Sequence, residues 1–409
     1  MLKLYNSMSR TKQVFRPRQD RRVKIFTCGP STYRRPHLGN YRTFLYEDVL
    51  VRYLEYLGYS VQRLINFTDV EDKMLEEAVR KGRSPGEIAD EVGKHFLRET
   101  AELKIKLPAK IARASESVPQ AVKLIQRLLK KGLAYWHGGN VFFDPLKVKD
   151  FGKLYRLDMQ KWPKRKVRFK KDTYNGMRWN RGDFILWHGQ NDGGLSSWDT
   201  EIGRGRPSWN IQDPAMITEH LGEQVDINCG GIDNIYRHHD YNIAIMESLS
   251  GKSLANYYLH GAHLIVDGKP MSKSRGNILY LEDLKARGYQ PHHLRFFLTS
   301  THYRSKLNLT ESKLRQASRK IDELRRLIAE LTSASGGRSA GPGFERLLAR
   351  LKTEFERHMD DDLNVGAAVE AVSEVLREIR REFHPLPRSA AGRLKAELAR
   401  IDGVLGFLL

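Results

Sequence analysis

Apolar and polar positions in the first seventy residues follow a pattern that predicts a strand, a helix and a second strand. Residues 23–28 form a short apolar run, and residues 61–67 form another. Residues 42–56 lie between them and carry apolar side chains with a helical period, at Phe44, Leu45, Val49, Leu50 and Leu54. Strand, helix and strand in this order form the unit of a parallel doubly wound sheet, whose ligands bind at the carboxyl ends of the strands. We therefore predict an α/β nucleotide-binding fold.

The pattern changes twice further along the chain. Beyond residue 96 a helical segment at 118–133 and an aromatic, basic stretch interrupt the sheet, and a strand ending at Ile227 resumes it. Helical periods follow from residue 281 onwards, at 281–287, 311–331, 344–355, 365–383 and 390–401. We predict two halves of a nucleotide-binding domain (1–96 and 205–280), an insertion domain (97–204), a helical region (281–332), a Ser- and Gly-rich linker (333–343) and a C-terminal helical bundle (344–409).

Composition narrows the class of protein. A chain of 409 residues can form two or three domains, each with its own core. Two cysteines in this length exclude a disulfide scaffold and fit a reducing compartment. No segment approaches the roughly 20 apolar residues that a membrane span needs. We therefore expect a cytoplasmic protein without membrane association, and a monomer.

The net charge changes the expected partners. Lys and Arg number 70 against 49 Asp and Glu, which leaves a net charge of +21. A positive field attracts polyanions, so RNA is a natural partner, although a basic solvated surface would give the same count. One cluster interleaves with aromatic residues, as RNA-binding segments do. Its candidate RNA-binding residues are Lys164, Arg165, Lys166, Arg168, Lys170 and Lys171.

Two short motifs predict phosphate chemistry. His37-Leu38-Gly39-Asn40 lies near the start of the first predicted helix, where backbone donors, the helix N-terminus and an imidazole can meet a triphosphate. Met271-Ser272-Lys273-Ser274 would bring a mobile ammonium to the same phosphates. This pairing is typical of ATP-dependent adenylating enzymes, in which a carboxylate attacks the α-phosphate. We expect His37, Asn40 and Lys273 to be catalytic. We expect the same three residues to bind ATP together with Gly39, Met271, Ser272 and Ser274.

Four further segments of the chain match the motifs of one enzyme family. The chain resembles the class I cysteinyl-tRNA synthetases from about residue 20 to its last residue, with the motifs in the family's order. The segments are Thr27-Cys28-Gly29-Pro30, Asn66-Phe67-Thr68-Asp69-Val70, Gly230-Gly231-Ile232-Asp233 and Met359-Asp360-Asp361-Asp362-Leu363-Asn364.

This resemblance implies ATP and Mg²⁺ as cofactors, and an amino acid and tRNA as substrates. It places Gly29 at both ATP and the amino acid, and Gly231 beside the adenosine, where Asp233 would accept from the ribose hydroxyls. A plain glycine turn is the alternative for residues 230–233. Thr68 would contact the substrate, or it would cap a helix at 71–81 together with Asp69. The insertion would bind the acceptor arm, and residues 281–332 would contact the tRNA stem.

The amino-acid pocket departs from the family, in which two cysteines, a histidine and a glutamate bind zinc. Cys28 and His238 match two of these ligands, but Asp213 and Asn242 stand at the other two positions. One thiolate and a carboxamide make a poor zinc site, so we expect no bound zinc unless Cys229 compensates. The alternative is that Cys28 packs as an apolar residue and His238 forms hydrogen bonds. The implied substrate-binding residues are Cys28, Gly29, Thr68, Trp209, Asp213, His238 and Asn242, and Cys28, Asp213 and His238 are the candidate metal ligands.

Without zinc, one thiol distinguishes cysteine from serine or alanine by only about 1 to 3 kcal/mol, so another amino acid is a possible substrate. The sequence also ends where family members continue into an anticodon-reading tail, which we expect to be absent, as in the mycothiol cysteine ligases. Three functions stay open. They are amino-acid activation with transfer to tRNA, ligation of the activated aminoacyl group to a small amine or peptide, and RNA binding without catalysis.

Overall fold

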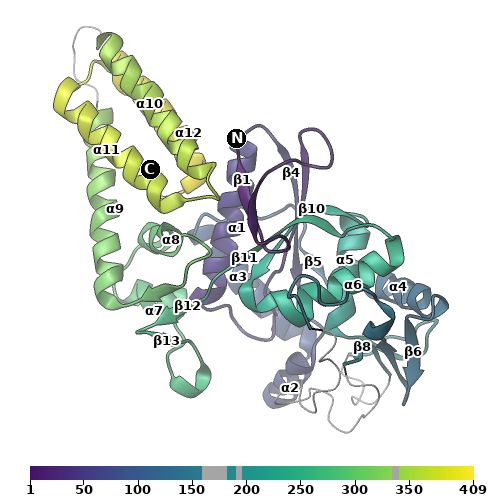
Figure 1. The fold of residues 1–409 in the computed structure, drawn as a ribbon. Helices are drawn as coiled ribbons and strands as arrows, with labels where there is room; N and C mark the ends of the chain where they lie inside the picture. The colour runs from purple at the N-terminus through teal and green to yellow at the C-terminus, as the bar shows by residue number, and fades with distance from the viewer. Residues whose placement is uncertain (159–181, 190–195, 334–339) are drawn as a thin grey trace.

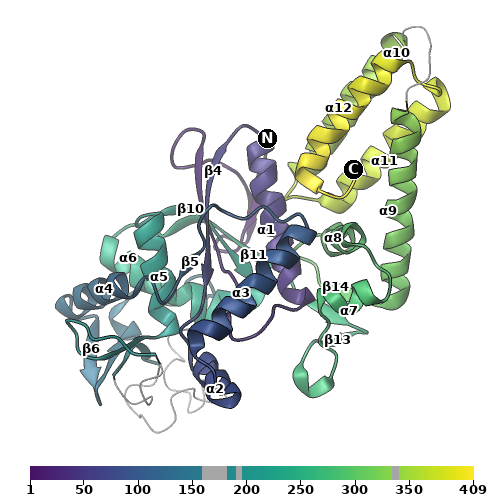
Figure 2. The same cartoon turned by 180° about the vertical axis from the view of Figure 1, so that it is seen from behind.

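The structure, a computed structural model, describes residues 1–158, 182–189, 196–333 and 340–409. Its centre is a five-stranded parallel sheet with strand order β11-β10-β3-β4-β5 (Figures 1 and 2). Strands from before and after the predicted insertion pair directly, because β10 adds to β3 with Ile227 opposite Ile25. The strands are β3 (Arg22–Thr27), β4 (Ser60–Phe67), β5 (Ala112–Arg113), β10 (Val225–Gly231) and β11 (Ala255–Gly261).

Helices cover both faces of this sheet. On one face, Ile25, Ile227 and Leu259 share a core with Val49 and Leu50 of helix α1 (Leu38–Tyr56). On the other face, Phe26, Leu64 and Tyr258 pack in a core with α4 (Val118–Lys130), α5 (Trp209–His220) and α6 (Asp240–Ser250). The predicted doubly wound parallel sheet is therefore confirmed.

The insertion carries a sheet of its own. Four antiparallel strands in the order β6-β7-β8-β9 pack beside α4. They are β6 (Ala134–His137), β7 (Asn140–Phe143), β8 (Phe184–Gly189) and β9 (Gly205–Pro207). Helices α2 (Asp72–Lys81) and α3 (Pro85–Glu102) come before this sheet in the chain. Helix α3 continues past residue 96, where we predicted that the insertion domain begins.

An N-terminal hairpin precedes the central sheet. Strands β1 (Lys3–Asn6) and β2 (Thr11–Val14) pair with each other, and Lys3 also forms a bridge with Asp361 near the C-terminal bundle. After β11, the chain forms a small three-stranded sheet in the order β13-β12-β14. These strands are β12 (Leu264–Val266), β13 (Lys269–Pro270) and β14 (Leu307–Leu309).

The remainder is helical, as the periodicity predicted. Figures 1 and 2 show α9 to α12 as an elongated arm beside the α/β body, and α10 packs along α11 and α12. We predicted 365–383 with the observed bounds, but α8 was not predicted. The helices are α7 (Leu281–Ala286), α8 (Pro291–Ser300), α9 (Glu311–Thr332), α10 (Gly341–Met359), α11 (Val365–Phe383) and α12 (Arg388–Leu405). None of the helices in the described residues has the length and apolar character needed to cross a membrane.

Candidate active site at the carboxyl edge of the sheet

The His37-Leu38-Gly39-Asn40 motif forms the first turn of α1, four residues earlier than the helix predicted from periodicity. His37 is the N-cap residue: its Nδ1 accepts from the Gly39 amide at 3.1 Å, and its own amide donates to Asn40 Oδ1 at 3.0 Å. These reciprocal bonds satisfy two of the orphan donors at the helix start. The motif therefore fixes its own turn at the end of the sheet where ligands bind.

The cap also decides the protonation state of His37. Because Nδ1 accepts a backbone proton, the neutral imidazole carries its hydrogen on Nε2. Burial lowers the pKa of His37, and the positive charge of Arg34 lowers it further. His37 is thus a neutral donor near pH 7, with Nε2–H as the group available to a ligand.

The Met271–Ser274 motif reaches this turn. A Cβ atom on Gly39 would lie 2.8 Å from Met271 Cε, so a glycine lets the methionine side chain approach the helix start. The loop is held by Asn277, whose Oδ1 accepts from the Ser272 amide at 2.9 Å. Leu38 then donates its amide to the Leu279 carbonyl at 2.9 Å. Two motifs more than two hundred residues apart in sequence therefore lie together, with the short turn Lys273–Arg275 beside them.

Residues 230–234, here called the β10 turn, begin with the last two residues of β10, the strand next to β3. Gly231 donates its amide to Asn234 Oδ1 at 3.2 Å, and a Cβ there would lie 2.6 Å from Asp233 Oδ1. Asp233 is exposed, and its charge acts on the His37 imidazole. The turn thus presents a carboxylate to the same edge of the sheet as His37.

Gly29 and Thr68 hold the loop that follows β3. The Gly29 amide donates to Asn66 Oδ1 at 2.8 Å, and a Cβ on Gly29 would lie 1.8 Å from the Asn66 carbonyl oxygen. The Thr68 carbonyl accepts from both the amide and the hydroxyl of Thr32. The alternative interpretation of Thr68 and Asp69 as helix caps is wrong, because α2 begins after Glu71. Asp69 instead accepts from Ser115.

The predicted pocket residues form one buried group beneath this loop. Asp213 accepts from Asn66 Nδ2 at 3.0 Å and from Asn242 Nδ2 at 3.3 Å, and its Oδ2 lies 2.7 Å from His238 Nε2. Trp209 stacks on the His238 ring with centroids 4.1 Å apart, and its side chain is 37% exposed. The tertiary structure therefore brings Cys28, Trp209, Asp213, His238 and Asn242 together.

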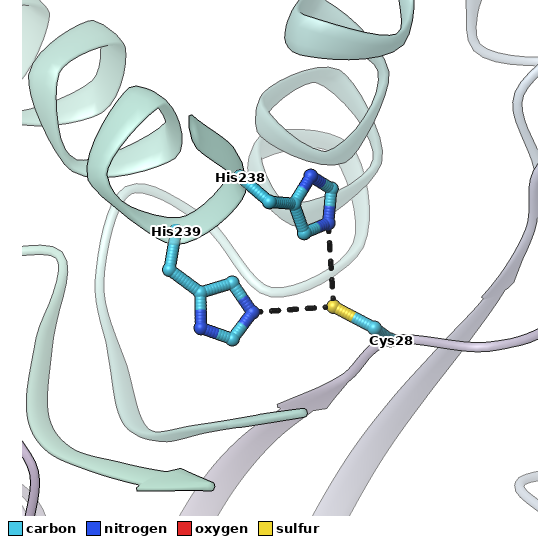
Figure 3. Close-up of side chains that lie close together, drawn as sticks. All are labelled: Cys28, His238 and His239. Carbon is cyan, nitrogen blue, oxygen red and sulfur yellow. Dashed lines mark hydrogen bonds between the residues drawn. The ribbon is translucent and has the colours of Figure 1, made fainter. Parts of the chain in front are cut away.

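Sequence reasoning missed His239, which faces the same pocket. Figure 3 shows Cys28 at the end of β3 with both His238 and His239 pointing toward its sulfur, at 3.4 and 3.3 Å. Adjacent residues on a regular helix point about 100° apart. Here the wide turn Ile235–His239 precedes α6, with Arg237 at a φ of 74°, so both imidazoles reach one side. The adjacent histidines in the sequence were the only available signal.

A chain of hydrogen bonds supports His239 from behind. His239 Nδ1 lies 2.8 Å from His260 Nε2, and His260 Nδ1 lies 2.8 Å from the Ser7 hydroxyl. Burial lowers the pKa of His239 well below its usual value and that of His260 to about 3. Burial, and next the negative charge of Asp213, raise the pKa of the Cys28 thiol well above its usual value. His239 and His260 are therefore neutral, and the Cys28 thiol is protonated.

The ligand set implied by the resemblance does not fit zinc. His238 Nε2 lies 2.7 Å from Asp213 Oδ2, and as the hydrogen-bond donor of this pair it offers no lone pair to a metal. Ligand atoms of Cys28, His238 and His239 lie within 4.8 Å of one another, but His238 is already a donor. Cys229 does not compensate, because it packs in the core on the α1 face of the sheet.

We expect elemental analysis of the purified chain to find well under one zinc per chain, because Cys28 and His239 alone would have to hold the metal, and structural zinc sites have four ligands. Activity should be fully retained when the chain is treated with a strong chelator, the chelator is removed and Mg²⁺ is added back. Cys28→Ala and His239→Ala variants serve as controls, since neither should change the metal content. Stoichiometric zinc in the wild-type chain that is lost in Cys28→Ala would contradict this expectation.

Some predicted residues cannot be placed. The candidate RNA-binding residues lie outside the described residues, as does most of the predicted linker. Lys273 belongs to a described turn of the backbone. The assignments of these residues stay predictions from the sequence.

Comparison with known proteins shows the family of the chain. Residues 14–319 match the family described as tRNA synthetases class I (C) catalytic domain, and residues 354–409 match the DALR domain. A cysteine--tRNA ligase of Leptospira interrogans is 35% identical over 100% of this chain and 87% of its own length. One from Chlamydia felis is 36% identical over 100% of this chain and 86% of its length, and one from Methanococcus maripaludis is 34% identical over 96% and 83%.

Solved structures support the same fold. Mycobacterium tuberculosis methionyl-tRNA synthetase bound by methionyl-adenylate superposes with a TM-score of 0.66 at 15% identity, covering 94% of this chain and 90% of that one. An Agrobacterium radiobacter leucyl-tRNA synthetase complex gives 0.68 at 12%, covering 96% and 85%. Since family and fold agree along nearly the whole chain, this protein belongs to the class I cysteine--tRNA ligase family and is an aminoacyl-tRNA synthetase.

Proposed function

We propose that the chain activates an amino acid with ATP through an aminoacyl-adenylate, transfers it to tRNA, and selects the amino acid without zinc. The observation that carries the proposal is the meeting of three motifs at the carboxyl edge of the sheet. The capped turn at His37, the loop at Met271 and the β10 turn converge there, next to the pocket at Cys28. ATP and an amino acid placed at these sites would bring the α-phosphate near the carboxylate.

Each group has a role that its chemistry supports. Nε2–H of His37 donates to a phosphate oxygen, and Asn40 keeps the His37 turn in place through its bond to the His37 amide. Lys273 stabilises the charge that grows on pyrophosphate as it leaves. Asp233 accepts from the ribose hydroxyls. Mg²⁺, when bound, neutralises part of the triphosphate charge.

The pocket supports a choice of amino acid by hydrogen bonding. Its floor is buried and polar, with His238 Nδ1 and Asn242 Oδ1 unpaired among the described residues. A site that hydrogen-bonds a substrate group rejects an analogue lacking that group by a large factor, because its own buried groups are then left unpaired. We therefore propose that the selected side chain donates to or accepts from these atoms, and that cysteine is one of several candidates.

A pyrophosphate-exchange screen with each of the twenty amino acids in turn tests activation and identifies the substrate. One amino acid should support exchange well above the others. The same amino acid should then appear on tRNA as an ester that is stable in acid and hydrolysed by mild base. Exchange without charging of any tRNA would overturn the acceptor and favour transfer to a small amine or peptide. No exchange with any amino acid would overturn the proposal.

We also expect the basic cluster at 164–171 to bind tRNA. Replacing all six basic residues with alanine should weaken RNA binding and flatten its dependence on salt, because each lost phosphate contact removes about 0.7 to 0.9 from the slope. Binding is measured across a salt series, beside aminoacyl-tRNA formation. The six replaced residues are Lys164, Arg165, Lys166, Arg168, Lys170 and Lys171.

The matched control exchanges Lys for Arg and Arg for Lys at the same six positions, which keeps the charge. That control should retain the wild-type salt slope. An alanine variant with an unchanged slope would show that this cluster does not contact phosphates.

A further inference from the structure

Tyr46 joins helix α1 to the ends of two sheet strands. It lies nine residues after His37, is 6% exposed, and its hydroxyl stands between β10 and β11. The hydroxyl lies 2.9 Å from the Gly230 carbonyl and 3.1 Å from the Leu259 carbonyl, and it accepts from the Gly230 amide at 3.2 Å. The same helix therefore carries the His37 turn and holds the start of the β10 turn.

The close fit of the ring restricts this arrangement further. A Cβ on Gly261 would lie 2.7 Å from Tyr46 Cε1, so the ring packs directly on the end of β11. Beyond Gly230 the chain turns outward, and Ile232 and Asp233 are exposed. Tyr46 is thus a buried side chain that fixes both polar groups of Gly230 just before the exposed part of the turn.

Tyr303 continues the contact away from the sheet. Its ring stacks on Tyr46, with centroids 4.9 Å apart and planes 18° apart. Its carbonyl accepts from the Ala262 amide at 2.8 Å, directly after β11. Its hydroxyl donates to Asp362 Oδ1 at 2.7 Å. Tyr303 therefore lies between the strand ends and the acidic segment that joins α10 to α11.

Asp362 is fully buried at this junction. Besides Tyr303, its carboxylate accepts from the Tyr5 amide at 2.8 Å and from Arg304 Nε at 2.7 Å. Its own amide donates to the Lys3 carbonyl at 3.0 Å. A buried carboxylate with this many partners has one position, so the base of the helical arm is held against both the N-terminal hairpin and Tyr303.

We propose that Asp362, Tyr303 and Tyr46 form a positioning relay that links the base of the helical arm to the β10 turn and thereby sets the affinity for ATP. The proposal rests on the proposed function, which places ATP at Gly231 and Asp233. None of the three residues touches the reacting atoms. When the relay is loosened, the β10 turn is less ordered before ATP binds, and ordering it uses part of the binding free energy. The KM for ATP therefore rises more than kcat falls.

The test uses the full chain with Mg·ATP in two measurements. The first is direct binding of Mg·ATP by calorimetry, and the second is pyrophosphate exchange with the amino acid identified by the screen. Tyr46→Phe should raise the Kd and KM for ATP by about tenfold, the size of one lost buried hydrogen bond. The kcat and the KM for the amino acid should stay within about twofold. Tyr303→Phe keeps the ring stack, loses the bond to Asp362, and should raise the KM for ATP by about threefold.

Tyr53→Phe is the matched control. Tyr53 is also a buried tyrosine of α1, and its hydroxyl donates to Asp360 Oδ1 at 3.0 Å in the same acidic segment. It has no bond to Tyr303 or Gly230 among the described contacts, so its loss should leave ATP binding unchanged. Combining Tyr46→Phe with Tyr303→Phe should raise the KM by less than the product of the single effects, because both act on one relay.

The outcomes distinguish failure of the relay from failure of the proposed function. Wild-type chain that binds Mg·ATP, together with a Tyr46→Phe variant of equal affinity, overturns the relay and leaves the proposed function standing. An equal rise in Tyr53→Phe also overturns the relay, because the effect would then be general loss of packing. Wild-type chain that binds no Mg·ATP overturns the proposed function itself.

Discussion

Lys273→Ala is expected to slow adenylate formation by roughly 10² to 10³, the size of the loss of one preorganised electrostatic contact in a transition state. The reason is that Lys273 follows Met271, which packs against the first turn of α1 where the triphosphate would lie. We therefore propose from the motif that the Lys273 ammonium stabilises the leaving pyrophosphate. The measurement is pyrophosphate exchange at saturating ATP and amino acid.

Lys269→Ala provides the comparison. Lys269 is an exposed lysine of β13, four positions before Lys273. Its removal changes the charge of the same hairpin and should leave the rate within about twofold, since an exposed charge acts weakly through water. Equal rates in Lys273→Ala and wild type would remove Lys273 from the catalytic residues.

Asp48→Ala is expected to lower the free energy of unfolding by about 3 to 5 kcal/mol, because it leaves a buried guanidinium without its carboxylate. Arg295 is 1% exposed and donates to Asp48 Oδ2 at 2.6 Å. The same guanidinium also donates to the carbonyls of Leu103 and Leu405. The pair therefore joins α1, the end of α3, α8 and the end of α12, and urea unfolding followed by tryptophan fluorescence measures its loss.

Two variants separate this effect from a general loss of charge. Glu378→Ala removes the partner of Arg350 in a pair at the surface of the arm and should change the unfolding midpoint little. The double variant Asp48→Leu with Arg295→Met replaces both charges with apolar side chains and should recover part of the lost stability. A single Asp48→Ala variant as stable as Glu378→Ala would show that the pair does not hold the elements together.

The accuracy of the sequence-based prediction differs between elements for identifiable reasons. Helix α11 has a regular apolar face, so its predicted bounds match those observed. Helix α8 buries every residue from 293 to 299 against several neighbours, which hides the amphipathic period. Helix α1 begins earlier than predicted because a histidine, which is not among the usual N-cap residues, provides the cap. Helix α3 carried a clear signal that periodicity alone did not use, namely Ser84 and Glu87 as a capping box.

The candidate site also has parts that the sequence could predict and parts that it could not. Short motifs with local chemistry, such as His37 to Asn40 and Gly230 to Asp233, could be read directly, because the residues that act together are adjacent in the chain. The sequence could also show that Asp213 and Asn242 stand where zinc ligands are expected. It could not show that the Asp213 carboxylate is occupied by Asn66, His238 and Asn242, because those contacts join segments far apart in the chain.

By itself, the sequence determined the family and the order of the sheet and helical regions, and it predicted the residues that would contact the phosphates of ATP. These follow from hydrophobic period and from motifs of neighbouring residues, which local chemistry controls. Only the tertiary structure decided that His239 faces Cys28, since a widened turn before α6 rotates it into the pocket. Only the tertiary structure connected Asp362 to Gly230 through two stacked tyrosines, because such a contact requires three distant segments to pack at one point.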